Sequence, residues 1–117
     1  MKKYNINIIE HDIDRAINKD YTEEELYELC RDESIAHTCD FCERYKTYDT
    51  IEEAKKDFVS LPVMTLFFGD RRTMRGTLRV RGYELEEAIC DDDDPEEQYE
   101  WNFIDMRFEA FVGKYLN

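Results

Sequence analysis

The sequence predicts one α+β domain spanning residues 1–117, with a small antiparallel or mixed sheet of about four strands packed by two to three helices. Two observations predict this class. Segments that alternate polar and apolar residues, as strands do, are interspersed with segments whose apolar residues recur every three or four positions, as in helices. Hydrophobic residues make up 42% of the chain and aromatic residues 14%, which is too apolar for a disordered acidic protein.

The N-terminal segment 3–9 is predicted to be a strand. Tyr4, Ile6 and Ile8 alternate with polar neighbours, which is typical of a half-buried strand. In the following segment, Ile13 and Ile17 are four residues apart, and this spacing indicates a short helical turn.

A first helix is predicted from about Thr22 to Arg31. Thr22 and Glu25 have the spacing of a capping box, and the acidic residues of the first turn suit the positive end of the helix dipole. If the helix continued in phase, its inner face would carry polar residues such as Glu33 and Asp40. The helix is therefore expected to end near Arg31.

The middle of the chain is predicted to form a strand and a second helix. Helical and strand periods compete between residues 35 and 48, and the Thr, Cys, Phe and Tyr residues there favour a strand. Thr50 and Glu53 form a second capping box. The helix that begins there is expected to end at Pro62, which cannot continue it.

A hairpin is predicted to follow. Residues 63–69 are apolar on both faces, so this strand is expected to be central in the sheet or covered by helices. After an arginine-rich turn, the return strand covers residues 77–89. Its apolar positions change from even to odd numbers across Gly82, which predicts a β-bulge there.

The C-terminal part is predicted to be a loop and then a helix. Residues 91–97 read DDDDPEE, where like charges repel and Pro95 interrupts any strand. Apolar residues recur at helical spacing from Trp101 to Tyr115, which predicts an amphipathic helix packed on the sheet. Because Tyr99, Trp101 and Phe103 alternate, the first few residues have a strand as their alternative.

The charge of the chain limits its partners. Its net charge is −13, from 29 acidic and 16 basic residues. Free nucleic acid and anionic membranes are therefore poor partners, whereas a basic protein surface is a suitable one. The one basic stretch is expected to pair with acidic residues of neighbouring elements rather than to bind phosphate; its members are Arg71, Arg72, Arg75, Arg79 and Arg81.

The sequence shows neither an apolar export segment after Met1 nor an apolar run of membrane-spanning length. We therefore expect a cytoplasmic protein with reduced cysteines. The alternative is a zinc-stabilised adaptor domain that uses Cys30, His37, Cys39 and Cys42. On the predicted strand Cys39 and Cys42 face opposite sides, so we expect buried structural thiols and no metal or cofactor.

The acidity favours a binding function over catalysis. A cluster at His11, Asp12 and Asp14 is the weakest hypothesis, because such a group is usually a solvated turn. Carboxylates on a rigid surface can imitate the phosphates of a duplex and occupy the groove of a nucleic-acid-binding protein. The alternative is that the carboxylates only aid solubility.

In size, charge and aromatic content, the chain is similar to the small acidic proteins that phages use to block host restriction or CRISPR nucleases. This similarity implies a non-enzymatic inhibitor or adaptor that binds a basic nuclease or other nucleic-acid-binding protein in the host cytoplasm. The predicted contact residues are Glu84, Glu86, Glu87, Asp91, Asp92, Asp93, Asp94, Glu96 and Glu97, with Tyr99 and Trp101 as apolar anchors.

Overall fold

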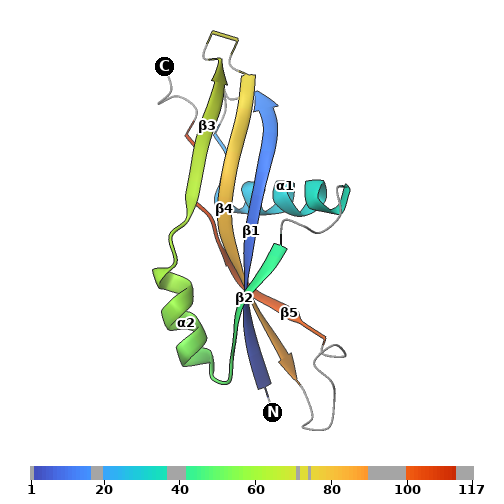
Figure 1. Cartoon of the computed structure of the whole chain (residues 1–117), viewed down its shortest axis with the longest axis vertical. Coiled ribbons are helices and arrows are strands. Elements are labelled where there is room, and N and C mark those ends of the chain that lie inside the picture. Colours follow the sequence, from blue (N-terminus) through green and yellow to red (C-terminus); the bar gives the residue numbers. More distant parts are fainter. Residues whose placement is uncertain are drawn as a thin grey trace.

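The structure is a computed structural model that describes residues 2–16, 20–36, 42–70, 72–73, 75–89 and 100–112. Within these residues, strands and helices follow one another along the chain as drawn in Figure 1. The elements are β1 (Lys2–Ala16), α1 (Glu23–Ala36), β2 (Cys42–Tyr48), α2 (Ile51–Ser60), β3 (Met64–Asp70), β4 (Arg75–Ile89) and β5 (Asn102–Arg107). The expectation of helices packed on a small antiparallel sheet is confirmed.

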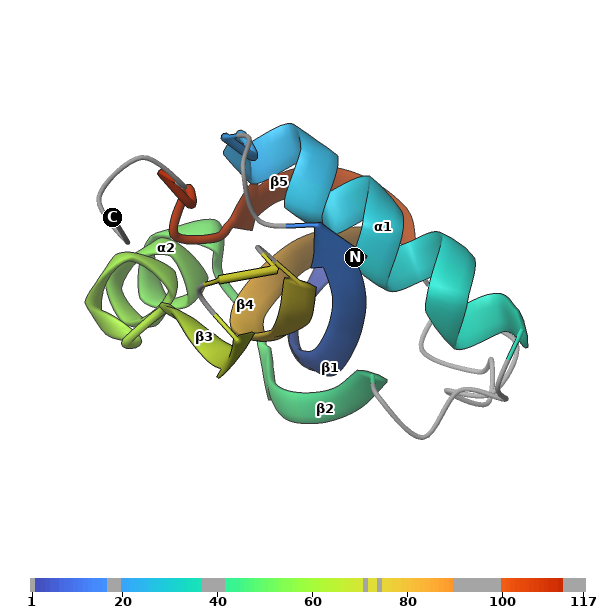
Figure 2. The same cartoon turned by 90° about the horizontal axis from the view of Figure 1, so that it is seen from above.

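The sheet is built around one long pair of strands. β1 and β4 are antiparallel partners over their whole length, from Lys2 opposite Ile89 to Ala16 opposite Arg75. β2 lies beside β1, whereas β3 and β5 share the other edge of β4, one following its first half and the other its second half. The sheet is narrow and curled, with the two helices packed on different sides of it (Figure 2).

The two faces of the β1–β4 pair carry different residues. We call the face with the odd-numbered residues of β1 the α1 face, and the face with its even-numbered residues the α2 face. Near the β3–β4 turn the core lies on the α1 face, where Ile13 opposes Leu78 and packs with Leu26 of α1. Near the N-terminus it lies on the α2 face, where Ile6 opposes Leu85.

The core crosses from one face to the other at Gly82. The β1–β4 register is continuous through Ile9 opposite Gly82 and Ile8 opposite Tyr83, so the predicted bulge at Gly82 is wrong. The change from even to odd apolar positions marks the crossing instead. Irregular pairing occurs in the outer strands, where Tyr45 of β2 and Ile104 of β5 are extra residues.

Several predicted element boundaries are wrong. Strand β1 continues to Ala16, so the helical turn expected at Ile13 does not form, and Ile17 lies outside the described residues. Helix α1 continues past Arg31 to Ala36. The strand expected at residues 35–48 is therefore shorter, and β2 begins at Cys42. Residues 37–41 lie outside the described part. Both views show the last turns of α1 projecting past the sheet, where the helix does not need an apolar inner face (Figures 1 and 2).

Both capping boxes are confirmed. The Thr22 hydroxyl accepts a hydrogen bond from the backbone N–H of Glu25 at 3.2 Å, and the Glu25 carboxylate accepts one from the backbone N–H of Thr22 at 3.5 Å. At α2, the Thr50 hydroxyl accepts from the backbone N–H of Glu53 at 3.3 Å. The helix ends at Ser60, two residues before Pro62, as the sequence predicts.

The position of β3 and the fold of the C-terminal segment differ from the predictions. β3 lies at an edge of the sheet rather than in its centre, and Leu66 and Phe68 are about half exposed. The segment from Asn102 to Arg107 is the strand β5, so the helical prediction is wrong there and the alternative is confirmed. After β5 the chain crosses the sheet, and Phe108 and Phe111 enter the core beneath α1.

The segment after β5 can pass over β4 only at a glycine, Gly82, because no larger residue fits beneath it. A Cβ atom there would lie 2.4 Å from the Phe108 ring and 2.7 Å from the carbonyl oxygen of Arg107. The missing side chain therefore lets the segment after β5 pass directly over β4.

We expect Gly82→Ala to lower the free energy of unfolding by about 1–3 kcal/mol, because the new methyl group overpacks the contact with Phe108. Urea unfolding of both proteins measures the loss. Phe108→Leu should reduce the cost of Gly82→Ala, since the smaller side chain leaves room. An equal cost in both backgrounds would contradict this explanation.

Candidate functional site

The N-terminal half of the α1 face is polar, because the core there lies on the other face. Asn5 and Asn7 of β1 are 2% and 9% exposed, and they oppose Glu86 and Glu84 of β4. Burying polar and charged groups costs free energy unless they are hydrogen-bonded. This half of the face is therefore stable only as a connected network.

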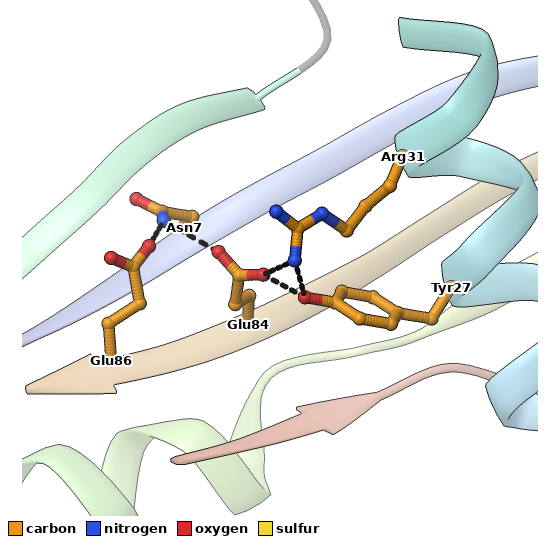
Figure 3. Close-up of polar contacts among 5 residues, drawn as sticks. All are labelled: Asn7, Tyr27, Arg31, Glu84 and Glu86. Atoms are coloured by element: carbon orange, nitrogen blue, oxygen red, sulfur yellow. Dashed lines mark hydrogen bonds and ion pairs between the residues drawn. The ribbon is translucent and has the colours of Figure 1, made fainter. Parts of the chain in front are cut away.

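The network joins the sheet to α1 (Figure 3). The Asn7 side-chain amide donates to Glu84 at 3.1 Å and also to Glu86. From α1, the Tyr27 hydroxyl donates to Glu84, and the Arg31 guanidinium lies 4.0 Å from the same carboxylate. Arg31 also donates to the Tyr27 hydroxyl at 2.9 Å, so Glu84 is the point at which helix and sheet are connected.

The two carboxyl groups have different pKa values. Burial, and after it the adjacent Glu84, together raise the pKa of Glu86 to about 7. Burial also opposes ionisation of Glu84, but hydrogen bonds from Glu86, Tyr27 and Asn7 and the charge of Arg31 outweigh it and lower its pKa. Between the two pKa values the pair thus carries one charge, on Glu84, and one proton, on Glu86; Glu86 loses this proton as pH rises through about 7.

A small cavity lies beside this pair. Its volume is about 170 Å³, and its walls include Arg31, Glu84, Glu86, Trp101 and Phe103. The Arg44 guanidinium stacks over the Trp101 ring at 5.4 Å. A space of this volume has room for on the order of five water molecules, enough to hydrate the carboxyl pair.

The structure divides the predicted contact patch. Glu84 and Glu86 belong to the network, and Glu87 lies on the opposite face, 4.0 Å from Lys2. Trp101 is half-buried. The other predicted contact residues lie outside the described part of the chain: Asp91, Asp92, Asp93, Asp94, Glu96, Glu97 and Tyr99.

An exposed acidic surface, which the sequence analysis did not single out, lies on α1. Glu23, Glu24 and Glu28 are exposed, and their carboxylates make no hydrogen bond or ion pair with any described residue. Tyr27 and Arg31 hold the same helix against the sheet through Glu84. We call these three glutamates the α1 acidic surface. The signal in the sequence is the run of acidic residues after Thr22, which also marks the start of the helix.

The His11, Asp12 and Asp14 cluster does not converge. His11 points to the α1 face, where it is buried, and the two aspartates point to the α2 face. There Asp12 pairs with Arg79 at 3.1 Å, and Asp14 accepts a hydrogen bond from Thr77 at 2.6 Å. Both aspartates are thus engaged with β4.

The predicted pairing of the arginines is confirmed for two of them. Arg79 pairs with Asp12, and Arg81 pairs with Glu10 at 2.7 Å. These pairs line a hollow of about 540 Å³ on the sheet surface, next to Met64. Arg71 lies outside the described residues, while Arg72 and Arg75 are exposed; neither is ion-paired to a described residue.

The proposed zinc ligands are only partly placed. Cys30 is fully buried in the core beneath α1, as expected for a structural thiol. Cys42 begins β2, but its side chain and the residues His37 and Cys39 are outside the description. In the described ranges no group of three or more His, Cys, Asp or Glu side chains is placed to hold a metal ion. The zinc alternative stays a prediction.

Comparison with known proteins gives no match to a protein family, a characterised protein or a solved structure. Neither α1 nor α2, the helices of the described residues, has the length and apolar character needed to cross a membrane. The function must therefore be inferred from the geometry and charge of this chain alone.

The raised pKa of Glu86 predicts a pH-dependent stability. Its usual value is 4.5 and its folded value is about 7, so between these values the folded chain holds a proton that the unfolded chain has released. The free energy of unfolding should therefore fall as pH rises through this range. Glu86→Gln removes the charge, and we expect it to stabilise the protein by about 1–2 kcal/mol near pH 8, allowing for partial solvent screening.

Thermal or urea unfolding at about pH 5 and about pH 8 measures this difference, which should nearly vanish at the lower value. Glu100→Gln is the matched control, because Glu100 is exposed. A similar gain from both variants, or a gain from Glu86→Gln that does not depend on pH, would contradict the assignment.

Proposed function

We propose that this chain is a non-enzymatic binding protein that attaches to a basic, nucleic-acid-processing protein through its acidic side chains. The observation that carries the proposal is the α1 acidic surface. Its glutamates are exposed, and no described base neutralises them. Carboxylates that are solvated and unpaired are available to a cationic partner, and they attract it over distances of about a Debye length.

The geometry of α1 supports the comparison with nucleic acid. Glu24 and Glu28 are four residues apart and so share one side of the helix, about 6 Å apart along its axis. Phosphates of one DNA strand recur every 3.4 Å or so along the duplex axis, which is of the same order. A groove built for phosphates can therefore accept such a row of carboxylates.

The internal network supports the proposal by fixing the helix. Tyr27 and Arg31 of α1 contact Glu84, so the exposed glutamates of the same helix keep their positions relative to the sheet. Glu84 and Glu86 thus become positioning residues rather than contact residues. An ordered acidic surface loses less conformational entropy on binding than a mobile one.

The finer parts of the proposal follow from the sequence. The acidic residues 91–97 with Tyr99 would extend the contact surface, and the partner would be a nuclease or another nucleic-acid-binding protein. Inhibition by mimicry, of the phage anti-CRISPR or anti-restriction kind, is the mode of action we propose. It would operate in the host cytoplasm. The competing explanation is that the same charges only keep the protein soluble.

We expect the triple variant Glu23→Lys, Glu24→Lys, Glu28→Lys to lose binding of basic nucleic-acid-binding proteins by tenfold or more, about 1.4 kcal/mol. The measurement is capture from nuclease-treated host lysate on the immobilised chain, with identification of the bound proteins. Capture should fall between about 50 mM and about 500 mM salt, because screening weakens ionic contacts. Added duplex DNA or RNA should compete.

The matched control is Glu52→Lys, Glu53→Lys, Glu100→Lys, which reverses three exposed charges on other elements. It changes the net charge equally but leaves α1 intact. If both triple variants lose capture to the same degree, total charge rather than the α1 acidic surface is responsible. Capture that resists both high salt and competing nucleic acid would contradict the proposal.

A further inference from the structure

The outer edge of β3 is open over most of its length. Among the described strands, β3 pairs only with β4. Its sequence, MTLFFGD, has no lysine or proline and only one charged residue, although such residues usually protect exposed edges. Leu66 and Phe68 are 45% and 49% exposed on the α2 face, where neither described helix covers this half of the sheet. The Arg79 guanidinium stacks on the Phe68 ring at 4.9 Å.

The backbone groups available on this edge can be identified. The N–H of Thr65 points outward, because it donates to the Glu109 carboxylate at 3.1 Å. Since strand residues alternate, the N–H and C=O groups of Phe67 and Gly69 point outward as well. No described residue pairs with them. Two residues of β3 therefore offer four unpaired backbone groups.

Charge selects the partner for this edge. Two copies of a chain with net charge −13 repel each other over most of their surfaces. The β3–β4 hairpin is the exception, because it carries the arginine-rich stretch. Arg72 in its turn is exposed and makes no ion pair with a described residue, while Glu109 lies at the other end of β3 beside Thr65. The edge is thus basic at one end and acidic at the other.

We propose that two copies of this chain associate through their β3 edges, antiparallel and about a two-fold axis at Phe68, so that Arg72 of each copy faces Glu109 of the other. In this register Phe67 of one copy exchanges backbone hydrogen bonds with Gly69 of the second copy, and Gly69 with Phe67, which uses all four free groups. The result is one continuous sheet across two molecules.

The side chains fit the same register. The two Phe68 rings become direct cross-strand neighbours on the α2 face, with Cβ atoms about 5 Å apart, where aromatic pairs stabilise a sheet. Arg72 of one copy comes opposite Met64 of the other, next to Thr65 and so beside Glu109. The antiparallel arrangement also keeps the two basic turns at opposite ends of the interface. This surface is separate from the α1 acidic surface, so the two proposals fail independently.

The test is a charge swap followed by sedimentation over a dilution series of the full chain. The natural protein should form a dimer that dissociates on dilution. Arg72→Glu and Glu109→Lys should each weaken the dimer by tenfold or more, because each places like charges at both ends of the interface. An equimolar mixture of the two variants should restore it, since opposite charges then meet at both ends. The double variant Arg72→Glu, Glu109→Lys should also dimerise.

Phe68→Lys should abolish the dimer, and Val59→Lys, which changes an exposed apolar residue on α2, should leave it intact. Circular dichroism confirms that each variant is folded. A natural protein that stays monomeric throughout overturns the proposal. A dimer that tolerates Arg72→Glu also overturns it, as does a mixture of the two variants that fails to associate. Either result would mean that two copies associate through a different interface.

Discussion

The crossing of the hydrophobic core from one face of the β1–β4 pair to the other, at Gly82, determines the rest of the structure. Each face is apolar along one half and polar along the other. α1 covers the apolar half of the α1 face, and α2 covers that of the α2 face. Side chains of α1 and β5 also pack over the polar half of the α1 face. The polar half of the α2 face stays open, with its arginine–carboxylate pairs exposed. The exposed Leu66 and Phe68 of β3 lie on this open half.

Glu84 shows what it costs to place charge beneath a helix. Desolvation opposes its ionised form. Hydrogen bonds from Glu86, Tyr27 and Asn7, with the charge of Arg31, together compensate. Buried polar networks of this kind contribute little net stability, because desolvation offsets most of the electrostatic gain. Their effect here is orientation: the bonds to Glu84 are satisfied in one arrangement of α1 over the sheet. For Glu86, burial and the adjacent Glu84 outweigh the contact with Asn7, so its pKa is raised.

The sequence predicted the elements that have strong local signals and missed those that depend on tertiary contacts. Two capping boxes located the helix starts, and Pro62 located the end of α2. The parity change at Gly82 was detected, but a bulge and a change of face produce the same pattern within one strand. Only the pairing with β1, whose own parity changes at the same place, separates them. The short β5 was ambiguous because its apolar residues fit both periods.

The site was predicted in part, for a similar reason. Glu84 and Glu86 were selected from the sequence as exposed contact residues, because their alternation along β4 resembles that of a solvated strand face, whereas the structure places them in a part-buried network. Their burial follows from Asn5 and Asn7 on β1, which is more than seventy residues away in sequence, and from Tyr27 on α1. No local pattern contains that information. The unpaired glutamates of α1 were visible in the sequence, but their exposure depends on which side of the helix meets the sheet.

The full-length pairing of β1 with β4 also affects how the chain folds. Lys2 pairs in register with Ile89, so most of the described chain lies between these two residues of the central strand pair. Such distant contacts close large loops and slow folding relative to helical proteins of the same size. During synthesis β1 leaves the ribosome first and stays without its main partner until β4 has been made. The hairpin of β3 and β4, whose contacts are local, can form on its own and then provide the template on which the N-terminal strand is added.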